Sequence, residues 1–363
     1  MENKRTCLYD RHLALKAKMT AFGGFEMPLM YSDIISEHQA VRNACGIFDV
    51  SHMGEVIVSG PDAERYVQYI FTNNVAQAEI GKIFYGLMLY PTGGVVDDLL
   101  VYKMADDRFL LVINAANIDK DVAWMQEHTT GFNVQVENRS DAYGQIAVQG
   151  PQAENVVTNV LGINCAQLVF YTFEMTTYAG QPVLISRTGY TGEDGFELYA
   201  DPSTTQAIWD ALIESGSVIP CGLGCRDTLR FEVGLPLYGD ELSDTITPIE
   251  AGLGIFVKVD KENFIGKDAI VQQKAEGAKR KIVGIELDDK AIPRHGYKVY
   301  CDGQEIGYVT TGYNSISTGK SVCMALIDKA CSTQGQRLQV AIHRKMHDGT
   351  VTPKKFYAKK YKK

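Results

Sequence analysis

Two adjacent aspartates lie within an apolar segment of the chain, Gly93-Gly-Val-Val-Asp-Asp-Leu-Leu-Val-Tyr102. Alternate residues of a β-strand point to opposite faces, so we expect Asp98 to share a face with Val96, and Asp97 to point to the other side. A carboxyl buried among apolar neighbours has a raised pKa, which suits general acid or base chemistry near neutral pH. Two interpretations are open: a buried acid or base, or two carboxylates that cap the Gly-Gly turn.

A second segment superficially resembles a phosphate-binding loop, Arg187-Thr-Gly-Tyr-Thr-Gly-Glu-Asp-Gly-Phe-Glu197. Phosphate-binding loops lead from a strand into the N-terminus of a helix, whereas residues 196–200 alternate like a strand. The segment therefore predicts a hairpin without a nucleotide site. Glu197 can accept two parallel N–H bonds from a planar, amidine-like group, or it is an ordinary exposed strand residue.

A third segment predicts a loop followed by a helix, Cys221-Gly-Leu-Gly-Cys-Arg-Asp-Thr-Leu-Arg-Phe-Glu232. Arg226 would lie near the start of this helix, where a cation opposes the helix dipole. We therefore expect a carboxylate beside it, from a ligand or from Asp227 or Glu232. The alternative is an ordinary amphipathic helix.

Metal and serine-nucleophile sites are not predicted. Cys221 and Cys225 lack a second Cys or His pair at zinc spacing. The segment His343-Arg-Lys-Met-His347 lacks the glutamate of the metalloprotease helix, and no Gly-x-Ser-x-Gly sequence occurs. We expect no metal.

Hydrophobic periodicity predicts the elements that position these segments. The first 50 residues predict a helical entry, with an amphipathic helix at 33–42. An α+β unit follows, with helices at 61–73 and 118–128 and strands at 55–58, 83–90, 95–103, 108–114 and 132–136.

The second half of the chain predicts strands before a final all-β region. The expected elements are strands at 145–149, 183–188 and 196–200 and helices at 204–215 and 226–233. A charged linker at 274–280 precedes short strands that predict a small β-barrel or sandwich, at 282–287, 297–299, 305–309, 321–326 and 338–342.

Composition limits the classes of protein that fit the chain. Its 363 residues suggest about two or three domains, and its 45% hydrophobic content is typical of a globular protein. The net charge of −8 argues against nucleic acid as a partner. The longest apolar run, residues 109–113, is too short to span a membrane. Eight dispersed cysteines, and an N-terminus without the pattern of a secretory or transit peptide, predict a cytoplasmic location.

Six lysines gather in the last eleven residues of this acidic chain. We expect a solvated, frayed terminus, because chain ends are usually poorly ordered. The alternative is a docking arm for an acidic partner.

Taken in order, the motifs resemble the aminomethyltransferase, or T-protein, family of the glycine cleavage system. The motifs are Leu8-Tyr-Asp10, Phe48-Asp-Val-Ser-His-Met53, Gly93-Gly-Val-Val-Asp-Asp98, Ala147-Val-Gln-Gly-Pro151, Gly189-Tyr-Thr-Gly-Glu-Asp-Gly195, Cys221-Gly-Leu-Gly224, Arg226-Asp-Thr-Leu-Arg230, Leu237-Tyr-Gly239 and Pro248-Ile-Glu-Ala-Gly252. They span nearly the whole chain.

The resemblance implies an α+β fold of three domains, arranged as a cloverleaf around a central folate channel. The first domain is discontinuous, over residues 1–52 and 142–273. Residues 53–141 form the inserted α+β domain, and residues 274–363 form the C-terminal β-barrel domain.

The resemblance also implies an enzyme that transfers a methylene group. The donor is the aminomethyl-lipoyl group of the lipoylated H-protein, and the acceptor substrate is tetrahydrofolate. Ammonia and 5,10-methylene-tetrahydrofolate are released. Other glycine cleavage proteins are implied partners, whereas a nucleotide, a metal, a nucleic acid and a membrane are not.

Site roles follow from the same resemblance. Asp98 matches the functional aspartate of the family, and an anion there stabilises an iminium-like transition state by electrostatic preorganisation. Glu197 matches the glutamate that binds the aminopyrimidinone edge of the pterin. The other implied binding residues are Arg226, Tyr190, Met53, Tyr85 and Asn114.

Some positions depart from the usual pattern of the family, which often has Trp where Phe25 stands, Ala at Cys225, Trp near Ile255 and Ser-Pro near Ser315. Two other functions are weighed. A folate-binding scaffold without transferase activity usually lacks the acidic pair. A flavin-dependent demethylase carries a dinucleotide-binding domain, and no G-x-G-x-x-G after a strand occurs here.

Overall fold

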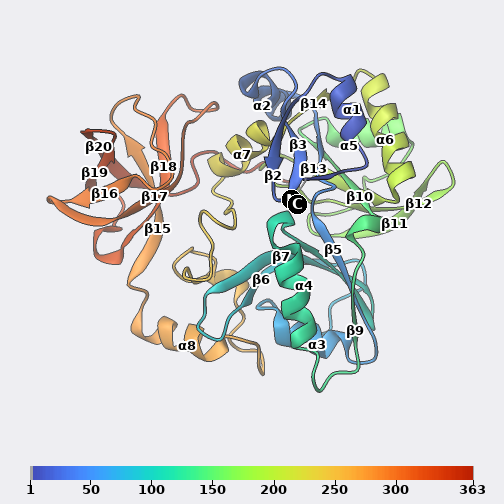
Figure 1. The fold of residues 1–363 in the computed structure, drawn as a ribbon, viewed down its shortest axis with the longest axis horizontal. Coiled ribbons are helices and arrows are strands. Elements are labelled where there is room, and N and C mark those ends of the chain that lie inside the picture. Colours follow the sequence, from blue (N-terminus) through green and yellow to red (C-terminus); the bar gives the residue numbers. More distant parts are fainter. Residues whose placement is uncertain (1–2, 363) are drawn as a thin grey trace.

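A computed structural model describes residues 3–362 and shows three packed units (Figure 1). Two contain an open β-sheet with helices, and the third is a closed six-stranded barrel. The predicted α+β class with a C-terminal β-barrel is confirmed. No helix among residues 3–362 has the length and apolar character needed to cross a bilayer.

The sheet of the first unit has the strand order β11-β12-β13-β10-β4-β14. Its strands are β11 (Phe173–Tyr178), β12 (Gln181–Ser186), β13 (Gly195–Ala200), β10 (Gly144–Gln149), β4 (Gly46–Asp49) and β14 (Ile219–Pro220). Helices α5 (Ala153–Leu161) and α6 (Pro202–Glu214) cover one face, and α2 (Ile34–Asn43) and α7 (Leu223–Glu232) pack on the other.

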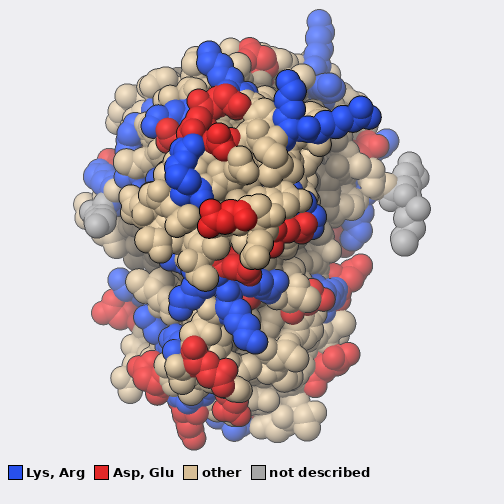
Figure 2. Space-filling model, turned by 90° about the vertical axis from the view of Figure 1, so that its left-hand side faces the viewer, with Lys and Arg blue, Asp and Glu red and all other residues tan. Residues whose placement is uncertain are grey.

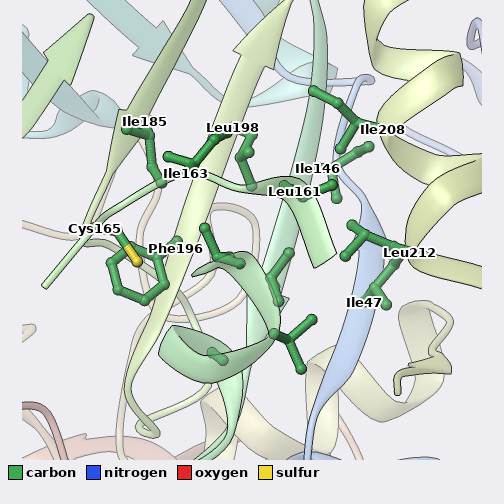
Figure 3. Packing of buried hydrophobic residues seen from close by; sticks show 14 of the residues in the cluster. Ile47, Ile146, Leu161, Ile163, Cys165, Ile185, Phe196, Leu198, Ile208 and Leu212 are labelled. Atoms are coloured by element: carbon green, nitrogen blue, oxygen red, sulfur yellow. The ribbon is translucent and has the colours of Figure 1, made fainter. Parts of the chain in front are cut away.

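Alternation along these strands builds two different surfaces. In Figure 3, side chains from one face of the sheet meet those of the covering helices: Ile47, Ile146, Ile185 and Leu198 against Leu161, Ile208 and Leu212. Helix α6 begins at a well-formed cap, because the Asp201 carboxylate accepts N–H bonds from Ser203 and Thr204. Glu197 and Tyr199 lie on the opposite face of β13, which faces the second unit.

The N-terminal segment differs from the predicted helical entry. It contains helix α1 (Tyr9–Ala14) and a small sheet of β1 (Lys4–Arg5), β2 (Lys18–Phe22) and β3 (Phe25–Met30). A turn at Gly23 and Gly24, both with positive φ, joins β2 to β3. The expectation of helix over the first 50 residues is therefore wrong apart from α1 and α2.

The second unit has the strand order β6-β7-β8-β5-β9. Its elements are β5 (Gly54–Ser59), α3 (Ala63–Ile70), β6 (Ile83–Leu89), β7 (Val95–Ala105), β8 (Arg108–Ile113), α4 (Ile118–Glu127) and β9 (Gln135–Asn138). Two short 3-10 turns, Ala115–Asn117 and Ser140–Ala142, flank this unit's last elements. The strand predicted at 132–136 instead begins at Gln135.

A β-bulge opposite Met88 and Leu89 interrupts the alternation at the start of β7. Val96 consequently packs with Leu99 and Val101 in the core under α3 and α4. The prediction that Val96 shares the face of Asp98 is wrong, whereas Leu100 and Tyr102 do face the first unit.

The barrel has the strand order β15-β18-β17-β16-β19-β20. Its strands are β15 (Arg280–Leu287), β16 (Lys298–Cys301), β17 (Gln304–Asn314), β18 (Ser321–Asp328), β19 (Arg337–Ile342) and β20 (Lys345–Thr352). Short 3-10 turns lie at Gly254–Phe256 and Lys329–Cys331. Strand β20 was not predicted from the sequence, because residues 347–350 show little apolar alternation.

The predicted linker at 274–280 is partly wrong, since helix α8 (Lys267–Glu276) runs into it. Gly277 ends the helix with a positive φ.

On the barrel side of the molecule, basic and acidic side chains are interspersed rather than gathered by sign (Figure 2). We keep the three-domain division at 52, 141 and 273 as a proposal.

Candidate functional site

A cavity of about 590 Å³ lies between the two units that contain open sheets, and the segment that follows the barrel lines part of it. Its wall combines strands of both open sheets, helix α7, residues 233–238, residues 252–256 and the C-terminal segment. All seven predicted site residues line this cavity: Met53, Tyr85, Asp98, Asn114, Tyr190, Glu197 and Arg226. The fold therefore collects, at one place, residues that are separated by up to 173 positions in the chain.

Asp97 and Asp98 point to opposite sides of β7, as predicted. The buried Asp97 carboxylate accepts bonds from the Asn114 backbone N–H (2.9 Å) and from the Asn114 and Asn117 amides (2.8 Å each). Asp98 lines the cavity and accepts bonds from the Tyr85 hydroxyl (2.9 Å) and the Asn114 amide (3.0 Å). Neither carboxylate caps the Gly93-Gly94 turn, so that interpretation is wrong.

The environment of Asp98 favours its neutral form. Burial raises its pKa to about 7, and the neighbouring Asp97 carboxylate acts in the same direction. The bonds from Tyr85 and Asn114 oppose this shift, because they stabilise the anion. Asp98 consequently changes charge near neutral pH inside a cavity, which is the behaviour of many catalytic acids and bases.

Glu197, on β13, lines the cavity and is buried. Its carboxylate accepts bonds from the Thr188 hydroxyl and, at 3.2 Å, from the Gln145 amide. Burial raises its pKa, while these donors and the charge of Arg226 act to lower it. The interpretation of Glu197 as an exposed strand residue is therefore wrong.

Arg226 is a cation without a carboxylate partner among residues 3–362. Asp227 pairs with Arg230 (2.7 Å), and Glu232 pairs with Arg42 (3.2 Å) and His38 (3.2 Å). The predicted ion pair with Asp227 or Glu232 is therefore absent. The guanidinium instead lies 4.8 Å from the centre of the Tyr190 ring, and burial lowers its pKa.

Aromatic and apolar groups complete the wall around these polar residues. The Tyr190 hydroxyl donates to the Pro236 carbonyl, which fixes its ring beside Arg226. Tyr85 packs edge-on against Phe256 with ring centres 4.8 Å apart. Met53 fills the space between two of the core clusters. A planar ligand would thus meet ring faces and edges as well as carboxylates.

Two polar atoms on the cavity wall have no hydrogen-bond partner among residues 3–362. They are Nδ1 of His52 and Oε1 of Gln145, and both side chains are buried. A buried unpaired polar atom is costly, so its persistence beside a cavity indicates a ligand or solvent partner. Neither residue was predicted as part of the site, although His52 lies in the motif Phe48-Asp-Val-Ser-His-Met53.

The C-terminal segment is the other part of the site that sequence analysis missed. Lys354, Lys355, Lys359 and Tyr361 line the cavity, and the Tyr361 ring stacks on Phe170 at 4.3 Å. The expectation of a frayed terminus is therefore wrong for residues 353–362. Their placement depends on contacts with distant parts of the chain, which periodicity does not reveal.

A potential metal cluster elsewhere has a different explanation. Glu37, Cys221 and Cys225 lie close enough to share an ion. The Glu37 carboxylate, however, accepts backbone N–H bonds from Tyr31 (2.6 Å), Ser32 (3.0 Å) and Gly222 (2.9 Å). These bonds account for its burial and anchor the loop before α7.

Comparisons with known proteins agree over the whole chain. Residues 8–261 match the family described as the GCVT N-terminal domain, and residues 280–358 match the glycine cleavage T-protein C-terminal barrel domain. Proteins named aminomethyltransferase from Lysinibacillus sphaericus and Bacillus subtilis are 51% and 49% identical, over 98% of this chain and 98% and 99% of theirs. The crystal structure of the glycine cleavage system aminomethyltransferase T from Bartonella henselae superposes with a TM-score of 0.94 at 32% identity, and the match covers 99% of each chain.

Proposed function

Because this chain belongs to the glycine cleavage T-protein family and is an aminomethyltransferase, we propose that its central cavity binds tetrahydrofolate as the one-carbon acceptor. The donor is the aminomethyl group on the lipoyl arm of an H-protein. The C–N bond to the amine and the C–S bond to the lipoyl sulfur break, and two C–N bonds to the folate form. Ammonia, the dihydrolipoyl carrier and 5,10-methylene-tetrahydrofolate leave, so no oxidant or reductant is needed.

The observation that carries this proposal is the pair of buried hydrogen-bond acceptors on the cavity wall. The Glu197 carboxylate and the unpartnered Gln145 Oε1 both face a space bounded by rings. The aminopyrimidinone edge of a pterin offers adjacent N–H donors, and a carboxylate accepts two of them in parallel. Although Glu197 already accepts two bonds, each carboxylate oxygen keeps a free lone-pair site.

Asp98 is the residue that we propose for catalysis. Its carboxylate lies on the cavity wall, held by donors from Tyr85 and Asn114. As an anion, it stabilises the positive charge that develops on the transferred carbon and its nitrogen partners, without rearrangement during the reaction. Asn114 also bonds Asp97, so it fixes the two carboxylates relative to each other.

The remaining residues position the substrate. Arg226 provides a guanidinium that forms no ion pair with a carboxylate of residues 3–362, and this group lies over the face of the Tyr190 ring. Met53 and Tyr85 supply contact area for the folate ring system. The proposal also includes the lipoylated H-protein and the other glycine cleavage proteins as partners, and a cytoplasmic location.

Calorimetric titration with tetrahydrofolate under anaerobic conditions tests the proposal for the cavity. We expect one site per chain. The matched probe is p-aminobenzoyl-glutamate, which lacks the pterin and should bind far more weakly, because it misses the donors that Glu197 and Gln145 accept. Equal affinity for both compounds, or no heat with either, would overturn the proposal.

A further inference from the structure

We propose that Asp121 is a neutral carboxylic acid whose O–H group donates to the Asp97 carboxylate, and that this bond positions Asp98. The inference deepens the proposed function, on which it rests, because it names a further residue that acts on the catalytic carboxylate. Asp121 lies on α4 and is not part of the cavity wall. It is therefore a positioning residue, which acts through Asp97 and Asn114.

Helix α4 places Asp121 behind the strand that carries the two aspartates. Met125 of this helix packs in one core cluster with Val96 and Leu99 of β7, and Figure 1 shows α4 beside that strand. Asp121 lies in the first turn of α4, and both Asp121 and Asp97 are 0% exposed. The carboxyl group of Asp121 lies in hydrogen-bonding contact with that of Asp97. Two carboxyl groups thus face each other without access to solvent.

The Asp121 carboxyl receives no hydrogen bond. Among residues 3–362, no N–H or O–H group donates to its Oδ1 or Oδ2. An acidic side chain in the first turn of a helix is ordinarily an anion that backbone N–H groups stabilise, and here those bonds are not formed. A buried carboxylate without donors is very costly. The contact with Asp97 is satisfied when Asp121 carries a proton and is itself the donor.

The charged groups that act on Asp121 are Asp97 from β7 and Lys120 from its own helix. Lys120 Nζ lies 3.2 Å from Oδ1 of Asp121, but it donates to the Val96 carbonyl and, at 3.4 Å, to the Tyr238 hydroxyl. The ammonium group also lies 4.5 Å from the centre of the Tyr238 ring. Burial and the Asp97 charge outweigh Lys120 and raise the pKa of Asp121 to about 10. The geometry and the charges therefore favour the same neutral form.

Asp97 accepts the proposed bond as an anion. Its oxygens already accept from the Asn114 backbone N–H (2.9 Å) and from the Asn114 and Asn117 amides (2.8 Å each). A carboxylate offers about four lone-pair sites, so Asp121 supplies the fourth donor. Burial raises the pKa of Asp98 to about 7, and the charge that these donors stabilise on Asp97 acts in the same direction.

Asn114 connects the position of Asp97 to that of Asp98. Its single amide nitrogen donates to Asp97 at 2.8 Å and to Asp98 at 3.0 Å. Without the donor from Asp121, the Asp97 carboxylate would draw Asn114 closer and weaken the bond to Asp98. A small displacement of a catalytic group lowers the rate of the reaction more than it weakens substrate binding.

Infrared spectroscopy tests the protonation of Asp121 in the full-length protein without any substrate. The C=O stretch of a neutral carboxyl group is separate from the bands of a carboxylate. Spectra are recorded at about pH 8.5, between the pKa values of Asp98 and Asp121. We expect the difference between wild type and Asp121→Asn to contain the band of one neutral carboxyl group. The matched control is Asp119→Asn, an exposed position on the same helix, whose difference spectrum should contain no such band.

Kinetics of two variants test the connection to Asp98. Asp121→Asn keeps a donor for Asp97, whereas Asp121→Leu has a similar size and no donor. We expect Asp121→Leu to lower kcat by about 10-fold and to change the Kd of tetrahydrofolate by about 2-fold or less. Asp121→Asn should retain kcat within about 2-fold of the wild type, because its amide replaces the O–H group. Thermal unfolding of each protein establishes that it is folded.

Three results would overturn the inference. The first is a difference spectrum of Asp121→Asn without the neutral band, which would assign Asp121 to an ion pair with Lys120. The second is a folded Asp121→Leu with the kcat of the wild type. The third is a kcat that falls as far in Asp121→Asn as in Asp121→Leu. If Asp121→Leu does not fold, the infrared band and the kcat of Asp121→Asn decide.

Failure of the proposed function gives a different result. A wild type that binds no tetrahydrofolate would reject that function, whereas the infrared band of Asp121 is measured without folate and would be unaffected. Conversely, tetrahydrofolate binding with no neutral band at Asp121 would reject only the role of Asp121.

Discussion

Asp98 is the residue on which the proposed chemistry depends, and its replacement by asparagine separates binding from catalysis. Asp98→Asn keeps the size of the side chain, so tetrahydrofolate should bind with little change. Loss of the anion should lower kcat by about 100-fold or more, as does removal of other preorganised groups that stabilise charge. The kcat is measured from the 5,10-methylene-tetrahydrofolate formed from aminomethylated H-protein and tetrahydrofolate. An unchanged kcat would remove Asp98 from the catalytic role.

The sequence alone predicts a mild effect for Asp97→Asn, because Asp97 faces away from Asp98. The structure changes this expectation. Asp97 accepts three bonds from Asn114 and Asn117, and Asn114 in turn holds Asp98. An asparagine at position 97 cannot accept all three of these bonds, so Asp97→Asn should lower thermal stability. Asn114 would also be displaced from Asp98, so kcat should fall as well.

The raised pKa of Asp98 predicts the pH dependence of the reaction. With a pKa of about 7, well above the ordinary 3.8, Asp98 is neutral below this pH and ionised above it. If the anion is the active form, kcat/KM for tetrahydrofolate should rise between about pH 6 and 8 and then level off. Tyr85→Phe removes a donor to the anion, so the midpoint should move to higher pH. A profile whose midpoint is the same in both proteins would contradict this assignment.

Glu197→Ala tests the proposed pterin end of the cavity. Loss of charge-assisted bonds worth roughly 1.5–3 kcal/mol each should weaken tetrahydrofolate binding by about 10-fold or more. The matched change Glu305→Ala removes an exposed carboxylate on the barrel and should leave the affinity unaltered. Calorimetry that gives the same Kd for Glu197→Ala and wild type would place the pterin elsewhere.

Residue type and spacing were enough to select these side chains, but their partners were not predictable. The alternation of residues 97–102 and 196–200 correctly predicted which side chains share a strand face. Arg226 illustrates what is missing: its nearest acidic neighbours in sequence, Asp227 and Glu232, bond other partners. Asp227 pairs with Arg230, and Glu232 pairs with Arg42 and bonds His38. Ion-pair choice depends on packing between elements, so a single sequence does not reveal it.

At the scale of the elements, helix α7 connects the units through Glu232. The buried Glu232 carboxylate bonds Arg42 and His38 of α2 and Ser315 and Ser317 of the barrel. Burial alone would raise its pKa, but the bonds and charge of His38 and the bonds of Ser317 lower it to about 2. The element that carries Arg226 is thereby fixed to both neighbours.

Glu232→Gln should lower the free energy of unfolding by about 3 kcal/mol or more, because it breaks a buried ion-pair network. Since the folded-state pKa is depressed from 4.5 to about 2, the stabilising effect is complete above about pH 5 and is lost as pH falls toward 2. The difference between variant and wild type should shrink over this range in urea unfolding. Glu305→Gln, which breaks the exposed ion pair with Lys298, should lower the free energy of unfolding by less than about 1 kcal/mol. If Glu232→Gln lowers the free energy of unfolding no more than Glu305→Gln does, the structural role of Glu232 is contradicted.

Elements with strong periodicity were predictable, and those that depend on tertiary contacts were not. Strands β6, β7 and β8 and helix α4 lie within a few residues of the predicted bounds. Strand β20 escaped prediction because its residues 347–350 show little apolar alternation and it gains order from pairing with β15 and β19. The bulge at Val96 likewise follows from pairing with β6 and not from the local sequence.

At the scale of the whole molecule, the two units with open sheets and the segment that follows the barrel together enclose a site that neither unit contains alone. Asp98 comes from one sheet, Glu197 from the other, and Lys355 from the segment that follows the barrel. The two sheets also meet through the Tyr102 and Tyr199 hydroxyls, 2.9 Å apart. Family motifs spread along the chain predicted this assembly, whereas the course of the C-terminal segment over the cavity required the structure.

The coupled reaction tests the central claim most directly. Aminomethylated H-protein is mixed with the enzyme, with and without tetrahydrofolate, and ammonia and 5,10-methylene-tetrahydrofolate are measured together. We predict ammonia release that depends on tetrahydrofolate, with one methylene-tetrahydrofolate formed for each ammonia. Ammonia released at the same rate without tetrahydrofolate, or no methylene-tetrahydrofolate formed with it, would contradict the account.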